Sequence, residues 1–267
     1  GAQMGFTCVE LLAFEGYGHT AGELAGRFFD RLDPQQITDL AMMLSRFDRV
    51  AVHAPFWEIV PFAANPATAE VSRAQLLRTV EVCGEIGAET VTTHVIPRAG
   101  RPLEHFRGDA LDLYRLLGDI AGECGVTVTI ETCYPPKIEQ FAALVHDIDH
   151  PAVGANVDVG HLRMLLTDEE RNPAALPEAY NALLDAHLRS LEGKIYHLHL
   201  HDTQVEGIRD HRECGTGIID YDAIFELLLD SDYAGFMTFE LEEPDARDAL
   251  ARSREVVAGA IARASRD

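Results

Sequence analysis

Three histidines alternate with apolar residues in the stretch 195–202, which reads IYHLHLHD. Residues two apart in a β-strand share a face, so His197, His199 and His201 are predicted to point the same way. Imidazole can bind a metal ion or transfer a proton, which makes this face a candidate site. We expect His199 at the level of the site, with His197 one layer below and His201 one layer above.

Polar side chains end five other strand-like runs in the same manner. Each run is rich in β-branched and apolar residues, and the polar residues recur at intervals of 27 to 41 positions, about one strand and one helix. The six residues of this set are His53, His94, Glu131, Asp158, His199 and Glu240. Residues two positions earlier share the same face and are also mostly polar, so each strand has one polar and one apolar side.

Helical patterns separate these runs. Apolar residues recur every three to four positions in 72–88, 109–125, 220–231 and 245–264, and glycine stands near the end of the first two. Strands that alternate with helices predict a parallel sheet. A closed TIM (β/α)8-type barrel explains the set best, because it brings the ends of all strands together at one mouth. An open doubly wound sheet would not, and no Gly-rich nucleotide-binding turn follows a strand.

The strand count falls one short of a complete barrel. Seven strand-like runs are visible, beginning with 9–14, whereas a TIM barrel has eight. We therefore expect the first βα unit to be missing from this chain. The resulting seam leaves two alternatives: an inactive chain, or one that closes the seam against a second copy in a homo-oligomer.

Composition limits the class of protein. The 267 residues are 47% hydrophobic and have no low-complexity linker, so a single domain over 1–267 is predicted. No apolar run reaches the roughly 18 residues of a membrane span, and the first residues lack a signal-peptide pattern. Five scattered cysteines fit a reducing cytoplasm. The net charge of −22 disfavours binding to nucleic acid.

The converging polar set indicates a metal centre. Buried carboxylates that face one another repel, and each costs several kcal/mol to desolvate, so a divalent cation would resolve both problems. Mixed histidine and carboxylate ligands suit Mn²⁺, Zn²⁺, Co²⁺ or Fe²⁺ better than Ca²⁺. The strongest candidate ligands are Glu131, Asp158, His199 and Glu240. A second group, His53, His94, His161 and His211, could hold another metal ion or bind substrate. Any one of these residues alone would be an ordinary core or surface residue.

Seven ordered motifs between residues 52 and 242 match one superfamily. They are VHAP, TTHV, TIET, NVDVGH, HLHD, DHRECGTGIIDY and FELE. With these motifs the chain resembles the xylose isomerase-like TIM-barrel superfamily, which includes sugar and sugar-phosphate isomerases, epimerases and the endonuclease IV group. The motifs identify the superfamily better than they identify a substrate, because one barrel hosts many chemistries.

The resemblance to the epimerases implies a function. In those proteins one ion is held by residues that correspond to Glu131, Asp158, His199 and Glu240, and the two glutamates move a proton on the sugar. His161 and Arg209 would then contact substrate hydroxyls or a phosphate. The expectation is a cytoplasmic, divalent-metal-dependent isomerase or epimerase that acts on a small sugar, sugar phosphate or keto-acid.

The resemblance to the endonuclease IV group implies an alternative, a zinc-dependent endonuclease for abasic DNA. Eight of its nine ligand positions match, but Arg209 stands where the ninth, an aspartate, is expected. A cation there should weaken a third metal site. A related lyase or dehydratase, and a metal-binding protein without catalysis, are further alternatives. We also expect Asp202 to fix the orientation of an imidazole.

Overall fold

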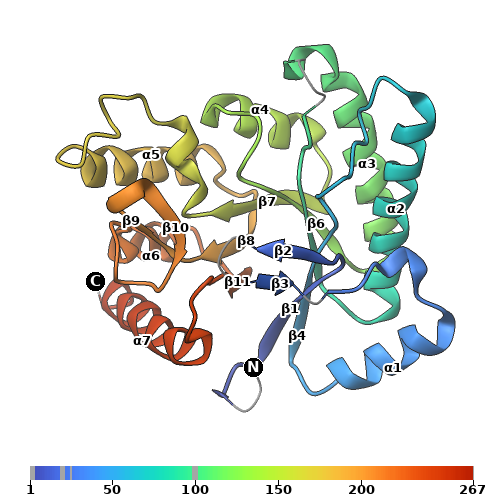
Figure 1. The fold of residues 1–267 in the computed structure, drawn as a ribbon, viewed down its shortest axis with the longest axis horizontal. Coiled ribbons are helices and arrows are strands. Elements are labelled where there is room, and N and C mark those ends of the chain that lie inside the picture. The colour runs from blue at the N-terminus through green and yellow to red at the C-terminus, as the bar shows by residue number, and fades with distance from the viewer. Residues whose placement is uncertain (1–3, 19–21, 25, 98–101, 267) are drawn as a thin grey trace.

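Seven parallel strands form the main sheet, in the order β1-β4-β5-β6-β7-β8-β11, and helices surround it (Figure 1). The computed structural model describes residues 4–18, 22–24, 26–97 and 102–266. The strands are β1 (Cys8–Leu12), β4 (Arg49–His53), β5 (Thr90–Thr93), β6 (Thr127–Glu131), β7 (Val153–Asp158), β8 (Ile195–Leu200) and β11 (Phe236–Phe239). The predicted fold class, a TIM-type barrel with seven visible strands, is confirmed.

Helices follow most of the strands and cover the outside of the sheet. They are α1 (Pro34–Leu44), α2 (Pro66–Glu85), α3 (Arg107–Cys124), α4 (Ile138–Ile148), α5 (Leu176–Ser190), α6 (Tyr221–Asp230) and α7 (Ala246–Ala264). Two short hairpins, β2 (Gly16–Gly18) with β3 (Gly22–Leu24) and β9 (Asp202–Gln204) with β10 (Arg209–Arg212), lie in connections between these elements.

Local sequence sets the helix ends. Asp33 and Gln36 form a capping box at the start of α1, where each side chain accepts a hydrogen bond from the backbone N–H of the other residue. α3 ends at Gly125, which has a φ of 71° in the left-handed region that glycine adopts without strain. The glycine predicted as a helix stop therefore has that role.

The side chains of each strand alternate between the barrel interior and the helix layer. In β8, Leu198 and Leu200 are fully buried in the hydrophobic core, whereas His197 and His199 face the interior polar groups. β6 has the same pattern, with Ile130 in the core and Glu131 at the rim. The twofold periodicity of the sequence thus separates the packing face from the polar face.

A hydrogen-bonded polar layer lies just below the rim. Thr92 Oγ1 lies 3.2 Å from Thr129 Oγ1 and 3.0 Å from His197 Nδ1. Asn156 Nδ2 donates to Thr92 Oγ1 at 3.3 Å, and His197 Nε2 lies 2.8 Å from Thr238 Oγ1. An unpaired buried polar group costs about 1–3 kcal/mol, so these mutual contacts let a polar interior remain stable. His197 lies one layer below the rim, as predicted.

The strands β1 and β11 are the two edges of the sheet, and side chains bridge the seam between them. Phe6, just before β1, packs edge to face against Phe239 of β11, with ring centroids 6.1 Å apart. Glu10 of β1 reaches across to His199 of β8, with 3.1 Å between Oε2 and Nε2. The barrel is therefore nearly closed by side-chain contacts, although β1 and β11 are not paired in the described sheet.

One buried histidine makes the stability of the fold depend on pH. His187 of α5 lies with Nε2 2.9 Å from Thr132 Oγ1, and burial lowers its pKa from 6.5 to about 4. Between these pH values the unfolded chain binds a proton at His187 more readily than the folded chain does. The contribution of neutral His187 to the free energy of unfolding is therefore fully present above pH 6.5 and is lost as the pH falls toward 4. We expect the wild type to lose about 2 kcal/mol more than His187→Gln between about pH 7.5 and about pH 5. Urea unfolding at both values measures this, and equal losses would contradict it.

Candidate metal centre

The register of four neighbouring strands brings the predicted ligands to one rim. Asp158 of β7 is paired with His199 of β8, which is also paired with Thr238 of β11. Glu131 ends β6, the strand on the other side of β7. Glu240 follows β11, and its backbone N–H donates to the carbonyl of Leu200 at 3.2 Å. One ligand atom from each of Glu131, Asp158, His199 and Glu240 lies within 4.8 Å of the other three.

The imidazole of His199 is at the centre of this group. Its Nδ1 lies 2.8 Å from Glu240 Oε2, 3.5 Å from Glu131 Oε2 and 3.7 Å from Asp158 Oδ2. His199, Glu131 and Asp158 are at most 1% exposed, whereas Glu240 is 38% exposed. Three carboxylates therefore converge on one imidazole nitrogen, and only one of them is open to solvent.

Two buried atoms of this group are placed to bind the same cation side by side. His199 Nδ1 and Glu240 Oε2 are both buried and lack a hydrogen bond, although they are close together. Buried polar atoms without a partner are rare in proteins and point to a bound ion or water. One imidazole and three carboxylates suit Mn²⁺, Zn²⁺, Co²⁺ or Fe²⁺. The residues present thus fit the predicted divalent cation, and their role as ligands remains a prediction.

The carboxylates are held in the ionised form that metal binding needs. Burial raises the pKa of Glu240, but the neighbouring His199 lowers it further, to about 2. The pKa of Asp158 is also low, because His161 and His201 outweigh the effect of burial. Burial opposes the ionisation of Glu131 as well, yet His94 and His199 hold its pKa well below the usual value. All three side chains are therefore ionised at neutral pH.

A second group shares Glu131. His53 Nε2 and His94 Nε2 lie 3.1 and 3.2 Å from Glu131 Oε2, and the two nitrogens lie 3.3 Å from each other. His53 Nδ1 donates to the carbonyl of Ala54 at 2.9 Å, which leaves Nε2 with its lone pair toward the carboxylate. Burial lowers the pKa of His94, but Glu131 raises it to about 9. In this group, the negative charge of Glu131 can be balanced by a protonated His94 or by a second cation.

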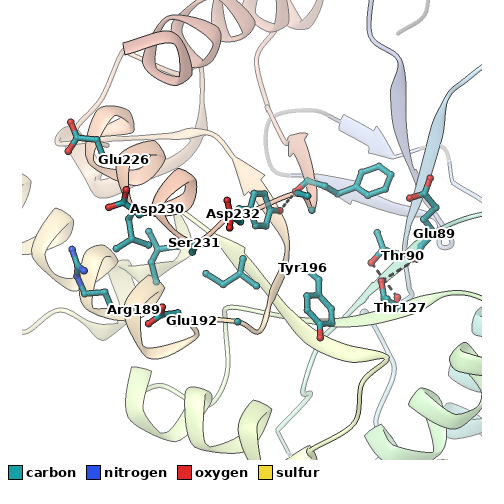
Figure 2. A pocket seen from close by; sticks show the side chains of 18 of the residues that line it. Glu89, Thr90, Thr127, Arg189, Glu192, Tyr196, Glu226, Asp230, Ser231 and Asp232 are labelled. Carbon is teal, nitrogen blue, oxygen red and sulfur yellow. Dashed lines mark hydrogen bonds between the residues drawn. The ribbon is translucent and has the colours of Figure 1, made fainter. Parts of the chain in front are cut away.

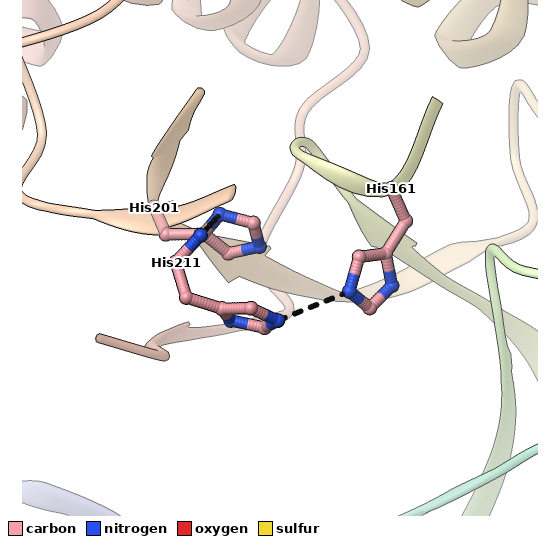
Figure 3. A group of neighbouring side chains, drawn as sticks. All are labelled: His161, His201 and His211. Atoms are coloured by element: carbon pink, nitrogen blue, oxygen red, sulfur yellow. Dashed lines mark hydrogen bonds between the residues drawn. The ribbon is translucent and has the colours of Figure 1, made fainter. Parts of the chain in front are cut away.

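A third group contains His161, His201 and His211 (Figure 3). His201 Nδ1 accepts the backbone N–H of His211 at 2.9 Å, and Nε2 donates to Asp158 Oδ1 at 2.9 Å. Neither nitrogen of His201 is free, so this residue orients Asp158 and does not bind a cation itself. His161 Nε2 and His211 Nε2 remain, 3.3 Å apart.

A tight turn supports Asp158 and His201. The backbone N–H groups of Gly160 and His161 donate to Asp158 Oδ1 at 2.8 and 3.0 Å. The ring of His201 lies against Gly160 so closely that a Cβ there would be 1.9 Å from its Cε1 atom. The turn, the carboxylate and the imidazole thus form one packed unit.

A cavity of about 380 Å³ opens beside the third group. It is lined by Cys133, His161, Arg163, Met164, Arg209, Asp210, His211 and Glu242. Its size suits a small molecule. Arg209 is exposed at the rim of this cavity. The endonuclease alternative expects an aspartate, the ninth metal ligand, at this position.

A larger cavity of about 810 Å³ lies at the opposite end of the barrel (Figure 2). Its lining includes residues at the beginning of strands, such as Thr90, Thr127, Tyr196 and Phe236. The four candidate ligands all stand at the other strand ends. Because barrel enzymes carry their chemistry at the carboxyl ends of the strands, the smaller cavity is the candidate site.

Two acids, Glu10 and Asp202, have contacts that differ from those predicted from the sequence. Glu10 was not predicted as a site residue, and it contacts His199; a lone acid inside the apolar run 9–14 was the available signal. Asp202 was predicted to orient an imidazole, and this is wrong. Its carboxylate accepts backbone N–H groups from Thr203, Gly215 and Ile219, because the chain turns after β8 and directs this side chain toward the following loop.

The fold and the rim define an α/β barrel with a candidate metal centre at its mouth. The chain belongs to the family described as xylose isomerase-like TIM barrel, which matches residues 1–258. The resemblance identified from the motifs is thereby confirmed. In the part of the chain that the structure describes, no helix combines the length and apolar character that crossing a membrane requires.

Among the proteins to which this chain is similar are a named dehydratase and proteins of known structure. An inosose dehydratase of Erwinia tasmaniensis is 30% identical over 158 residues, which are 50% of this chain and 47% of the relative, so the match spans about half of that protein. A D-tagatose 3-epimerase-like protein of known structure has a TM-score of 0.75 and 20% identity, with 99% of this chain and 91% of that chain covered. A protein called IOLI, solved with a zinc atom, has a TM-score of 0.69 and 18% identity, with coverages of 98% and 90%.

Two buried aspartates allow a matched test of the metal centre. Asp158 and Asp202 are both fully buried, but only Asp158 faces the candidate ion. Adding Mn²⁺ or Zn²⁺ to the metal-free wild type should raise its melting temperature, by an amount equivalent to about 2.7 kcal/mol at 100 times the Kd. Asp158→Asn should remove most of this increase, whereas Asp202→Asn should lower the starting temperature and keep the increase. Differential scanning calorimetry measures both, and an equal increase in all three proteins would contradict the assignment.

Proposed function

We propose that this protein is a divalent-metal-dependent isomerase or epimerase that acts on a small sugar or sugar phosphate, with Glu131 and Glu240 as the proton-transferring residues. The observation that carries the proposal is the convergence of Glu131, Asp158 and Glu240 on His199 Nδ1 beside a cavity of small-molecule size. Membership of the family and the sugar-modifying relatives support it.

The four residues Glu131, Asp158, His199 and Glu240 would hold the ion. When bound, a divalent ion polarises a substrate carbonyl and makes the adjacent C–H bond more acidic. In the barrel order β6-β7-β8-β11, the two glutamates come from the outer strands of this set, with Asp158 and His199 between them. A substrate carbon placed over the middle of the set would have one carboxylate toward each of its sides.

Glu131 and Glu240 differ in their surroundings, which suits a proton relay with two partners. Both are ionised at neutral pH, so either can accept the proton from carbon. Glu131 is fully enclosed by imidazoles, whereas Glu240 is partly exposed and can exchange its proton with solvent. Glu131 as a carboxylate would remove the proton from one face of the carbon. Glu240, after taking up a proton from solvent, would return it to the opposite face, which inverts the carbon.

A dehydratase is the second candidate, and the 30% identity with an inosose dehydratase favours it. Removal of a proton next to a carbonyl is also the first half of this reaction. The departing hydroxyl then needs a proton to leave as water. His161 lines the cavity, and Asp158 raises its pKa well above the usual value despite burial, so it is placed to donate that proton.

Hydrogen exchange at carbon tests the shared first step. The metal-loaded wild type, incubated in D₂O with a panel that includes D-tagatose and inosose, should introduce deuterium at one carbon, as observed by proton NMR. Glu131→Gln and Glu240→Gln should each reduce the rate by about 10²–10⁴-fold, since a glutamine cannot accept the proton. Appearance of an epimer indicates an epimerase, and release of water with a new unsaturated or diketo product indicates a dehydratase.

Glu89→Gln is the matched control for this experiment. Glu89 lines the cavity at the opposite end of the barrel and is paired with Arg49, so this variant should keep the wild-type rate. If Glu131→Gln and Glu240→Gln both remain active, the mechanism with two glutamates is wrong.

A further inference from the structure

Glu10 is a buried carboxylate that the proposed proton relay does not use. It stands in the middle of β1, and its side chain is only 6% exposed. Oε2 lies 3.1 Å from His199 Nε2 and 3.7 Å from His197 Nε2. A carboxylate inside a barrel is costly unless it has a charged or hydrogen-bonded partner, so its contact with His199 calls for a function.

The two nitrogens of His199 face different partners. Nε2 faces Glu10, and Nδ1 faces Glu131, Asp158 and Glu240. The 3.1 Å contact between Glu10 Oε2 and His199 Nε2 is a hydrogen bond, in which the ring N–H donates and the carboxylate oxygen accepts. Nε2 must then carry the hydrogen that joins the two side chains, and the lone pair available for a cation is on Nδ1.

Glu10 is not itself well placed as a metal ligand. Glu10, His197 and His199 are close enough to suggest a separate cation site. Both nitrogens of His197, however, are engaged by the hydroxyls of Thr92 and Thr238. With the Nε2 of His199 protonated, this group can offer a cation only the carboxylate of Glu10.

We propose that Glu10 is a positioning residue, which holds the Nε2–H of His199 and thereby presents Nδ1 to the metal ion at the rim. A carboxylate behind a metal-binding histidine fixes the ring orientation and tautomer and makes the ligand nitrogen more basic. The inference rests on the proposed metal centre and adds a residue of β1 to it. It also links the strand at one edge of the sheet to the ligand on β8.

Metal affinity, measured without any substrate, tests this role. Competition with a chromophoric chelator gives the Kd of Zn²⁺ or Mn²⁺, and the d–d absorption of the Co²⁺ complex reports on the ligand geometry. Glu10→Leu should weaken affinity by about 10–100-fold and change the Co²⁺ spectrum. Glu10→Gln, whose amide oxygen still accepts from Nε2, should keep the spectrum and lose less affinity.

Thr238→Val is the matched control. Thr238 also contacts an imidazole inside the barrel, that of His197, but one layer below the rim. This variant should lower the melting temperature of the metal-free protein and keep the wild-type Kd. Circular dichroism identifies variants that are folded before metal is added, and Glu10→Gln provides the test if Glu10→Leu does not fold.

The outcomes separate this inference from the proposed function. A wild type that binds metal, with an unchanged Kd and Co²⁺ spectrum in both Glu10 variants, would overturn the role of Glu10 alone. An equal loss of affinity in Thr238→Val and Glu10→Leu would mean that disturbed packing explains the loss, and this would also overturn the role of Glu10. A wild type that binds none of the three metals would overturn the metal centre and the role of Glu10 together.

Discussion

Burial of like charge at the barrel rim is the constraint on which the arrangement of the site depends. Glu10, Glu131, Asp158 and Glu240 all lie within reach of His199, and at least three of them are almost completely enclosed. Isolated ions of this kind would each cost several kcal/mol and would protonate instead. The surrounding imidazoles keep the acids ionised, and parallel strands in fixed register keep acids and imidazoles together. Charge balance and strand register therefore support the same site.

Hydrogen bonds behind the rim decide which nitrogen of each imidazole is available. The carbonyl of Ala54 leaves Nε2 of His53 free, the backbone N–H of His211 engages Nδ1 of His201, and Glu10 leaves Nδ1 of His199 for the rim. The seven histidines near the rim thus have different roles, although their residue type is the same. Two of these contacts are made by backbone atoms. The path of the loops therefore helps to determine which imidazole nitrogen is available, together with the side chains.

The fold and most of the rim could be predicted from the sequence, because both follow from simple periods. Alternation within strands separates the core from the polar face, and the recurrence of a polar residue at the carboxyl end of successive strands, about one βα unit apart, locates the mouth. Glu10 was missed because one acid in an apolar run is compatible with an exposed edge strand as well as with the barrel interior. Asp202 was misjudged because its direction depends on the turn after β8. Periods describe strands and helices, and they contain no information on where a loop points.

The contact between Gly160 and the ring of His201 limits which sequences can form this rim. Gly160 has a φ of −97°, which any residue adopts, so the backbone alone does not require glycine at this position. The requirement comes from volume, because the imidazole occupies the space of a side chain at position 160. An evolving chain could therefore acquire alanine here only after the imidazole at 201 had been lost or had turned away from Asp158. The order of substitution is therefore constrained, because His201 must change before Gly160 can.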